Sequence, residues 1–174
     1  MPVVPLIPVR MRRLPTVGGL AVPWITLVTP DGRVRFGVVN ARRQQAAILG
    51  RLCQICGQAL EARIVLAMRA VDLRRHLAPE PGQHPECAGY SVRACPMLSG
   101  RLNQYRSNPA PVDPAVGTTV GDSERGRAGQ PAEPWSLVWV SGYRATTDPE
   151  NGLPAVLVLP WQVLRVRPIR QQES

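Results

Sequence analysis

Two short motifs of cysteine and histidine are the part of the sequence best suited to chemistry. Cys53 and Cys56 form a Cys-x-x-Cys pair, and His84 and Cys87 form a second pair with the same spacing. Thiolate and imidazole are ligands that zinc prefers, and a structural zinc ion takes four of them in a tetrahedron. The spacing therefore predicts one structural zinc ion, Zn2+, held by Cys53, Cys56, His84 and Cys87.

The residues next to each pair favour this interpretation. Gly57 directly follows the first pair, where a tight turn needs a residue that tolerates positive φ. Pro85 suits the first turn of a helix, because its missing N–H would have no partner there. A helix that begins at this point places His84 and Cys87 on one side. We expect this ligand-bearing helix to cover residues 86–94.

Cys95 is the cysteine that the two pairs leave over. On a continuous helix it would lie about 12 Å further along the axis than Cys87, from a rise of about 1.5 Å per residue. Zinc–sulfur bonds of about 2.3 Å cannot span that distance. We interpret Cys95 as a small apolar residue at the helix end. A helix that breaks early would instead let Cys95 replace His84 as the fourth ligand.

Two other interpretations of the cysteines stay open. Four cysteines could form two disulfides, which requires an oxidising compartment. The apolar N-terminal stretch is interrupted by prolines and has no preceding basic region, so it does not resemble a signal peptide. We therefore expect the cytoplasm of a bacterial or phage-infected cell. Cys53 and Cys56 could also be a redox dithiol, which would leave the second pair unexplained.

The composition predicts a small core and a basic surface. The 174 residues include 19 prolines, 15 glycines and one phenylalanine, and only 5% are aromatic. A metal with about 10–16 kcal/mol of apparent binding free energy would then decide whether the chain folds. The net charge is +9, and all 21 basic residues are arginines. Such a surface attracts phosphate backbones or acidic proteins. No apolar run is long enough to span a membrane.

The pattern along the chain predicts an α+β fold of small antiparallel β-hairpins, a treble-clef-like zinc site and one or two short helices. The turn at Asp31-Gly32 joins two strands, and Asn40 is the expected N-cap of a short helix. The stretch 62–68 is expected to be a strand. A C-terminal hairpin pairs residues 135–140 with 155–159 and has a possible third strand at 160–167. We expect this hairpin to join the first hairpin in one sheet.

Composition also divides the chain into three parts. Residues 1–98 hold the first hairpin and the zinc-binding core, although the proline-punctuated residues 1–23 are expected to form a loose arm. Residues 99–134 are rich in proline and glycine, and they cannot bury enough apolar surface to offset their ordering entropy, so we predict a flexible linker. Residues 135–170 form the C-terminal β-hairpin, which packs on the core.

The order of these motifs resembles two groups of proteins. The pattern Cys53-x-x-Cys56-Gly57 followed by His84-x-x-Cys87 resembles the treble-clef zinc fingers over about residues 52–95. The same pattern, with Cys95-Pro96, Pro23-Trp24 and Val138-Trp139-Val140, is similar to a set of uncharacterised proteins from actinobacteria and their phages. The sequence departs from that set at Ala67-Met68-Arg69, where the relatives have a Gly-Pro turn. The resemblance implies a source and an architecture but no reaction.

The sequence predicts a zinc-stabilised binding module that contacts nucleic acid with weak sequence preference and steep salt dependence. The expected contacts are the arginines that flank the metal site, Arg42, Arg43, Arg51, Arg74 and Arg75. The alternative is a phage- or actinobacterium-encoded protein-interaction factor that binds an acidic partner protein and is not an enzyme.

An enzyme is the least favoured of the three classes. A nuclease of the HNH type uses a pair of histidines in the hairpin before the helix. The chain has only one histidine, His76, besides the predicted ligand His84, so it lacks this pair. A zinc deaminase needs a glutamate two residues after its histidine, which Glu86 supplies for His84. That family places its histidine before its cysteines, however, and here the order is reversed.

Overall fold

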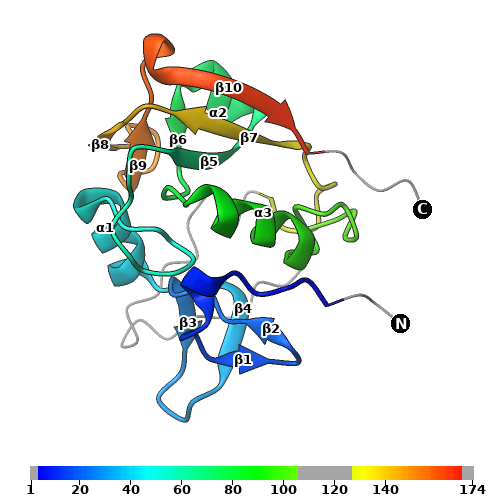
Figure 1. Cartoon of the computed structure of the whole chain (residues 1–174). Helices are drawn as coiled ribbons and strands as arrows, with labels where there is room; N and C mark the ends of the chain where they lie inside the picture. The colour runs from blue at the N-terminus through cyan, green and yellow to red at the C-terminus, as the bar shows by residue number, and fades with distance from the viewer. Residues whose placement is uncertain (1–3, 106–126, 170–174) are drawn as a thin grey trace.

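The computed structural model describes residues 4–105 and 127–169. Within them, small antiparallel sheets and short helices form the α+β fold that the sequence predicts (Figure 1). The helices are α1 (Ala41–Gly50), α2 (Ala70–Arg75) and α3 (Pro85–Ala94), with 3-10 turns η1 (Val9–Met11) and η3 (Pro160–Gln162). None of these helices has the length and apolar character needed to cross a bilayer.

Two three-stranded sheets enclose the largest core. One has the order β10-β7-β5 and the other β6-β9-β8. Their strands are β5 (Ile64–Arg69), β6 (Leu77–Ala78), β7 (Trp135–Val140), β8 (Arg144–Thr147), β9 (Pro154–Leu157) and β10 (Val163–Pro168). Side chains from both sheets and from α1 meet in what we call the aliphatic core: Ile48, Ile64, Leu66, Met68, Ala78, Val138, Val140, Tyr143, Val156 and Val158.

Strand β5 is the element that links this core to the predicted zinc ligands. All six of its residues are buried, as expected for an apolar run that is covered on both faces, and the last of them, Arg69, is buried in an ion pair with Asp72. Alternate side chains enter the aliphatic core, while Val65 faces the other way and packs with Ala88 of α3 and Leu137 of β7. The ligand-bearing helix α3 therefore covers the outer face of the central sheet (Figure 1).

The first predicted hairpin is confirmed. β3 (Thr26–Val28) pairs with β4 (Val34–Val39), and alternate residues of β4 are half-buried and exposed. The predicted N-cap is also confirmed, because the Asn40 side chain accepts a hydrogen bond of 3.1 Å from Arg43 N. A further pair, β1 (Thr16–Val17) with β2 (Leu20–Ala21), precedes this hairpin.

The predicted strand pairing in the C-terminal part is wrong. β7 pairs with β5 and β10, whereas β9 pairs with β8 and β6. The turn at Asn151-Gly152 does form, but it joins β8 to β9 and not β7 to β9. The first hairpin stays a separate sheet. The physical reason is that the buried β5 offers β7 a longer apolar partner than the four-residue β9 does.

The predicted linker at 99–134 lies in large part outside the described residues, which omit 106–126. Its two described ends lie side by side. Tyr105 N donates to Gln130 O at 2.9 Å, and Ala132 N donates to Asn103 O at 2.8 Å.

Candidate metal centre

The Cys-x-x-Cys pair lies in a tight turn between Leu52 and Ala59, which form an isolated antiparallel bridge. Gly57 N donates to Cys53 O at 2.8 Å and closes the turn. Gly57 has φ of +74°, and a Cβ at this position would lie 2.7 Å from Cγ of Trp24. Both the backbone conformation and the nearby indole therefore require glycine.

Backbone hydrogen bonds bring the second pair to the first. Gln83 and Val65 exchange two bonds of 2.9 Å, and Gln54 N donates to Gly82 O at 3.0 Å. His84 then follows as the N-cap of α3, with Pro85 in its first turn, so the predicted helix start is confirmed. The turn at residues 53–57, which we call the knuckle, and the start of α3 thus lie face to face, although the chain between them forms β5, α2 and β6.

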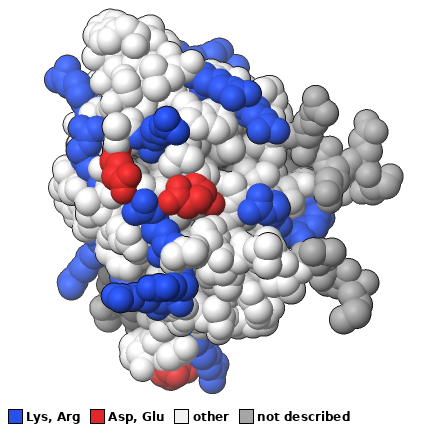
Figure 2. All heavy atoms as spheres, in the orientation of Figure 1, with Lys and Arg blue, Asp and Glu red and all other residues white. Residues whose placement is uncertain are grey.

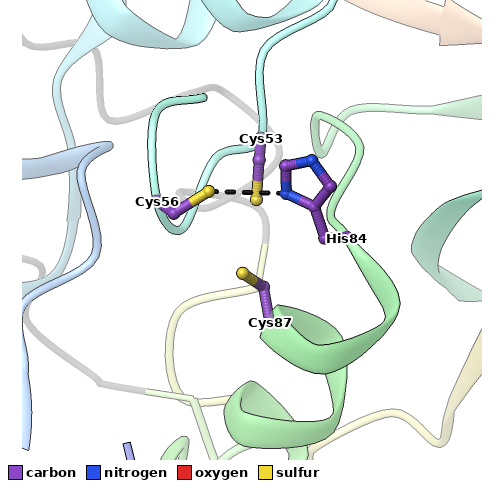
Figure 3. A group of neighbouring side chains, drawn as sticks. All are labelled: Cys53, Cys56, His84 and Cys87. Carbon is purple, nitrogen blue, oxygen red and sulfur yellow. Dashed lines mark hydrogen bonds between the residues drawn. The ribbon is translucent and has the colours of Figure 1, made fainter. Parts of the chain in front are cut away.

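The four predicted ligands converge on one point. The Sγ atoms of the three cysteines and one ring nitrogen of His84 all lie within 4.8 Å of one another, and all four residues are buried. Their tips point toward a common centre (Figure 3). Cys56 Sγ lies 3.4 Å from His84 Nδ1. Tetrahedral zinc, with bonds of about 2.3 Å to sulfur and about 2.0 Å to nitrogen, requires a sulfur–nitrogen separation of about 3.5 Å. The cluster can therefore hold a metal ion.

The imidazole of His84 is oriented from outside the cluster. Its Nε2 lies 3.0 Å from Ala59 O, at the end of the turn that carries the cysteines. When Nε2 carries the proton and donates to this carbonyl, Nδ1 presents its lone pair to the cluster. Metal-binding histidines usually have such a second partner, which fixes the tautomer and the ring orientation.

The close packing of the thiols disfavours their ionisation unless a cation is present. The pKa of Cys56 lies well above its ordinary value because the Cys53 side chain lies beside it and burial penalises the thiolate. For Cys53, the Cys56 side chain lowers the pKa, but contact with Cys87 and burial raise it more, so the pKa is also raised. A bound dication would reverse this balance, since metal binding deprotonates coordinating thiols.

Cys95 lies outside the cluster. It is half-buried and follows the last residue of α3 as its C-cap. The helix is not broken early, so the structure places His84, and not Cys95, with the other three residues. All four cysteines are free thiols.

The N-terminal segment takes part in this centre, which the sequence interpretation missed. Met11 is fully buried against the three cysteines, together with Ala21 and Tyr90. The prediction of a loose arm is therefore wrong for the described part of that stretch. The Tyr90 hydroxyl accepts a hydrogen bond of 2.8 Å from Ala21 N. Nothing in the local sequence signals these contacts, because the partners are far apart in the chain.

Arg10 connects the N-terminal segment by hydrogen bonds to α3 and to the residues that follow the knuckle. Its guanidinium donates to Glu86 Oε1 at 2.6 Å, to Gln58 Oε1 at 3.1 Å and to Glu61 Oε1 at 3.0 Å. Burial raises the pKa of Glu86, but the hydrogen bond from Arg10, the bond from its own backbone N–H and the nearby positive charge together lower the pKa more. Glu86 is thus an ion-pair partner on the outside of α3 and does not point into the cluster as a deaminase glutamate would.

The five arginines that we predicted to contact nucleic acid lie on separate elements. Arg42 and Arg43 lie on α1, Arg51 is the C-cap of that helix, and Arg74 and Arg75 lie on α2. Three of them contact other side chains of this chain. Arg43 stacks over Trp24 at 5.5 Å and Arg51 over Tyr143 at 4.9 Å. Arg75 pairs with Asp148 at 2.6 Å.

The other two of the five, Arg42 and Arg74, are exposed. Basic side chains are spread over the face in view and gather in one run at the place that β10 occupies in Figure 1 (Figure 2).

Comparisons with protein-family models, curated proteins and solved structures found no match for this chain. The similarity to actinobacterial and phage proteins stays a prediction. The treble-clef resemblance is limited to the knuckle and the helix start, because β5 and β6, which lie between them, belong to different sheets and do not form a hairpin.

Proposed function

We propose that Cys53, Cys56, His84 and Cys87 bind a structural zinc ion. The observation that carries this proposal is the convergence of four buried ligand atoms within 4.8 Å. Three sulfurs and one imidazole nitrogen form a donor set that favours zinc over harder ions such as magnesium or calcium. Four protein ligands complete a tetrahedron and leave no position for a substrate, so the centre is structural and not catalytic.

Metal content of the reduced, purified protein tests this proposal. We expect one zinc per chain in the wild type and in Cys95→Ser, and none in Cys53→Ser. The Cys95→Ser variant is the matched control, because it removes a thiol of the same chain that lies outside the cluster. Equal zinc in all three proteins, or no zinc in the wild type, would contradict the ligand set.

We infer that the zinc-stabilised fold is a binding module whose first candidate partner is nucleic acid. The net charge of +9 and the exposed Arg42 and Arg74 support this inference. Arginines spread over several elements contact phosphates without reading bases, so we expect weak sequence preference.

A salt titration of oligonucleotide binding tests the nucleic-acid partner. Each phosphate contact that is lost should reduce the slope of log K against log salt by about 1. Arg42→Gln and Arg74→Gln should each do so, whereas Arg43→Gln should instead lower stability. A flat salt response would exclude nucleic acid as the partner.

An acidic protein is the second candidate, and a specific observation favours it. Arg43, Arg51 and Arg75 stack on aromatic rings or pair with carboxylates of this chain, so fewer arginines near the metal centre are available for phosphates. Exposed apolar side chains elsewhere in the fold suit a protein partner better than a nucleic acid.

A further inference from the structure

The C-terminal strand β10 and the turn η3 before it expose three large apolar side chains close together in the sequence. Trp161 is 76% exposed, Leu164 63% and Val166 45%. β10 lies at the edge of its sheet and pairs only with β7 among the described strands. An exposed edge strand with apolar side chains is a template for pairing with another extended segment.

The backbone of β10 has a defined outward direction. Ile169 N donates to Trp135 O at 2.9 Å, which marks a hydrogen-bonded pair at the end of the β10–β7 ladder. Because such pairs alternate along antiparallel strands, Arg167 and Arg165 direct their backbone groups toward β7. Val166 therefore directs its N–H and C=O outward. Pro168 also lies on the outward side but has no N–H to offer.

The side chains of β10 also alternate. Arg165 and Arg167 lie on the sheet face that carries Trp139, and Arg165 stacks over that indole at 5.5 Å. Val166 lies on the opposite face, in register with Val138. Neither arginine forms an ion pair within residues 4–105 and 127–169. The edge thus combines the outward N–H and C=O of Val166, its apolar side chain and two arginines that form no ion pair with the described residues.

We propose that β10 is a docking strand for an extended acidic segment of a partner protein. The segment adds to the sheet beside β10 and pairs its backbone with Val166. Its residue opposite Val166 is apolar, and the residues on either side are acidic and meet Arg165 and Arg167. This proposal rests on the proposed role as a binding module, and it names the surface and the sequence pattern of the partner.

The same features set the length of the docking site. The register between β10 and β7 shifts at Leu164, and Pro168 has no backbone N–H to donate from the outward edge. These features shorten the edge and protect it from unlimited sheet-to-sheet association. The regular stretch between them centres on Val166, so the partner segment pairs over a few residues and binds weakly unless Trp161 and Leu164 contact it as well.

The test uses the full-length, zinc-loaded protein and a synthetic peptide, acetyl-Thr-Glu-Val-Glu-Thr-amide. We expect saturable binding and amide shifts in NMR spectra centred on Leu164–Arg167. A peptide with Gln in place of Glu should bind on the order of tenfold more weakly, because it loses the charge complementarity. No saturable binding up to about 1 mM, or shifts centred elsewhere, would overturn the proposal.

Variants separate the two parts of the recognition. Arg165→Glu with Arg167→Glu should abolish binding of the Glu peptide, whereas Arg42→Glu with Arg74→Glu, which makes the same charge change elsewhere, should preserve it. Val166→Pro removes the outward N–H and should also abolish binding. Dispersed amide spectra and retained zinc show whether each variant is folded.

A single-stranded oligonucleotide provides the competing outcome. If it binds the same strand and displaces the peptide, and Arg165→Glu with Arg167→Glu abolishes its binding, the surface is a nucleic-acid site and the protein-docking proposal is wrong. A folded, zinc-loaded protein that binds no peptide overturns this inference alone, whereas absence of zinc overturns the metal proposal.

Discussion

The aliphatic core and the candidate metal centre join distant parts of the chain by different means. In the aliphatic core, side chains from both three-stranded sheets and α1 pack by apolar contact, and the Tyr143 hydroxyl adds a hydrogen bond of 3.1 Å to Ile48 O. In the metal centre, the knuckle, the start of α3 and the N-terminal segment meet around four candidate ligand atoms, and apolar side chains such as Met11 and Tyr90 pack around them. Leu60 packs against both groups and lies where they join.

The difference shows what each region needs in order to fold. Loss of one side chain from the aliphatic core removes only part of its stabilisation, because many other contacts remain. Loss of one metal ligand removes the whole contribution of the ion, about 10–16 kcal/mol in small zinc sites. That contribution is of the same order as the net stability of a typical domain, about 5–15 kcal/mol. We therefore expect the two regions to respond differently to substitution.

The largest effect is expected for Cys87→Ser. The variant should lose zinc, and amide protection should fall in the N-terminal segment and the knuckle, while β5 and β7 keep most of theirs. Hydrogen exchange measured by mass spectrometry checks this. Equal loss of protection in all strands would mean that the two regions fold as one unit and that the comparison between them is wrong.

Leu66→Ala tests the other region. Leu66 is fully buried in the aliphatic core, and such a truncation costs about 2–5 kcal/mol. Thermal or denaturant unfolding should show this loss, with the zinc content of the folded protein unchanged. A variant that folds but no longer binds zinc would show that the aliphatic core positions the ligands directly.

Tyr90→Phe tests the shell around the metal centre. The substitution leaves Ala21 N without the hydroxyl that accepts its hydrogen bond at 2.8 Å. An unsatisfied buried donor costs about 1–3 kcal/mol. Unfolding should show this loss, and zinc should transfer faster to a chelator. Tyr105→Phe is the matched control, because its hydroxyl donates to Glu133 at 3.2 Å away from the metal centre.

The smallest effect is expected at Asp148, which is distant in sequence from the metal ligands. Burial raises its pKa, but the bonds from Arg75 and from Glu150 N lower it more, so the pKa lies below its usual value of 3.8. The ionised carboxylate therefore stabilises the fold above that value, and this contribution is lost as the pH falls through the depressed pKa. Asp148→Asn should cost about 1 kcal/mol near neutral pH.

The difference in unfolding free energy between wild type and Asp148→Asn should stay constant from about pH 5 to 7 and shrink below about pH 4. Denaturant unfolding across this range measures it. A difference that grows on acidification would show that the pKa is raised in the fold.

The candidate metal ligands and the helix starts were predictable because their signals are local. A Cys-x-x-Cys pair followed by glycine predicts a tight turn, and a histidine followed by proline predicts a helix start, each from a few adjacent residues. Asn40 likewise predicts a helix start, because asparagine is a preferred N-cap residue. These features need no knowledge of what lies across the fold.

The strand partners and the N-terminal contacts were not predictable in this way. Alternation in residues 135–140 shows that they form a strand but does not identify β5 as the neighbour, because apolar patterns fit several partners. Arg10 reaches Gln58 and Glu86, which lie 48 and 76 residues further along the chain. Such contacts depend on how the sheets and helices are arranged in the whole fold, and no short motif encodes that arrangement.

X-ray absorption at the zinc edge tests the central claim most directly, because it reports the atoms bound to the ion. We predict three sulfurs at about 2.3 Å and one nitrogen at about 2.0 Å. Cys95→Ser should leave this spectrum unchanged, and Cys87→Ser should abolish it. A shell of oxygen ligands, or four sulfurs that include Cys95, would contradict the metal centre described above.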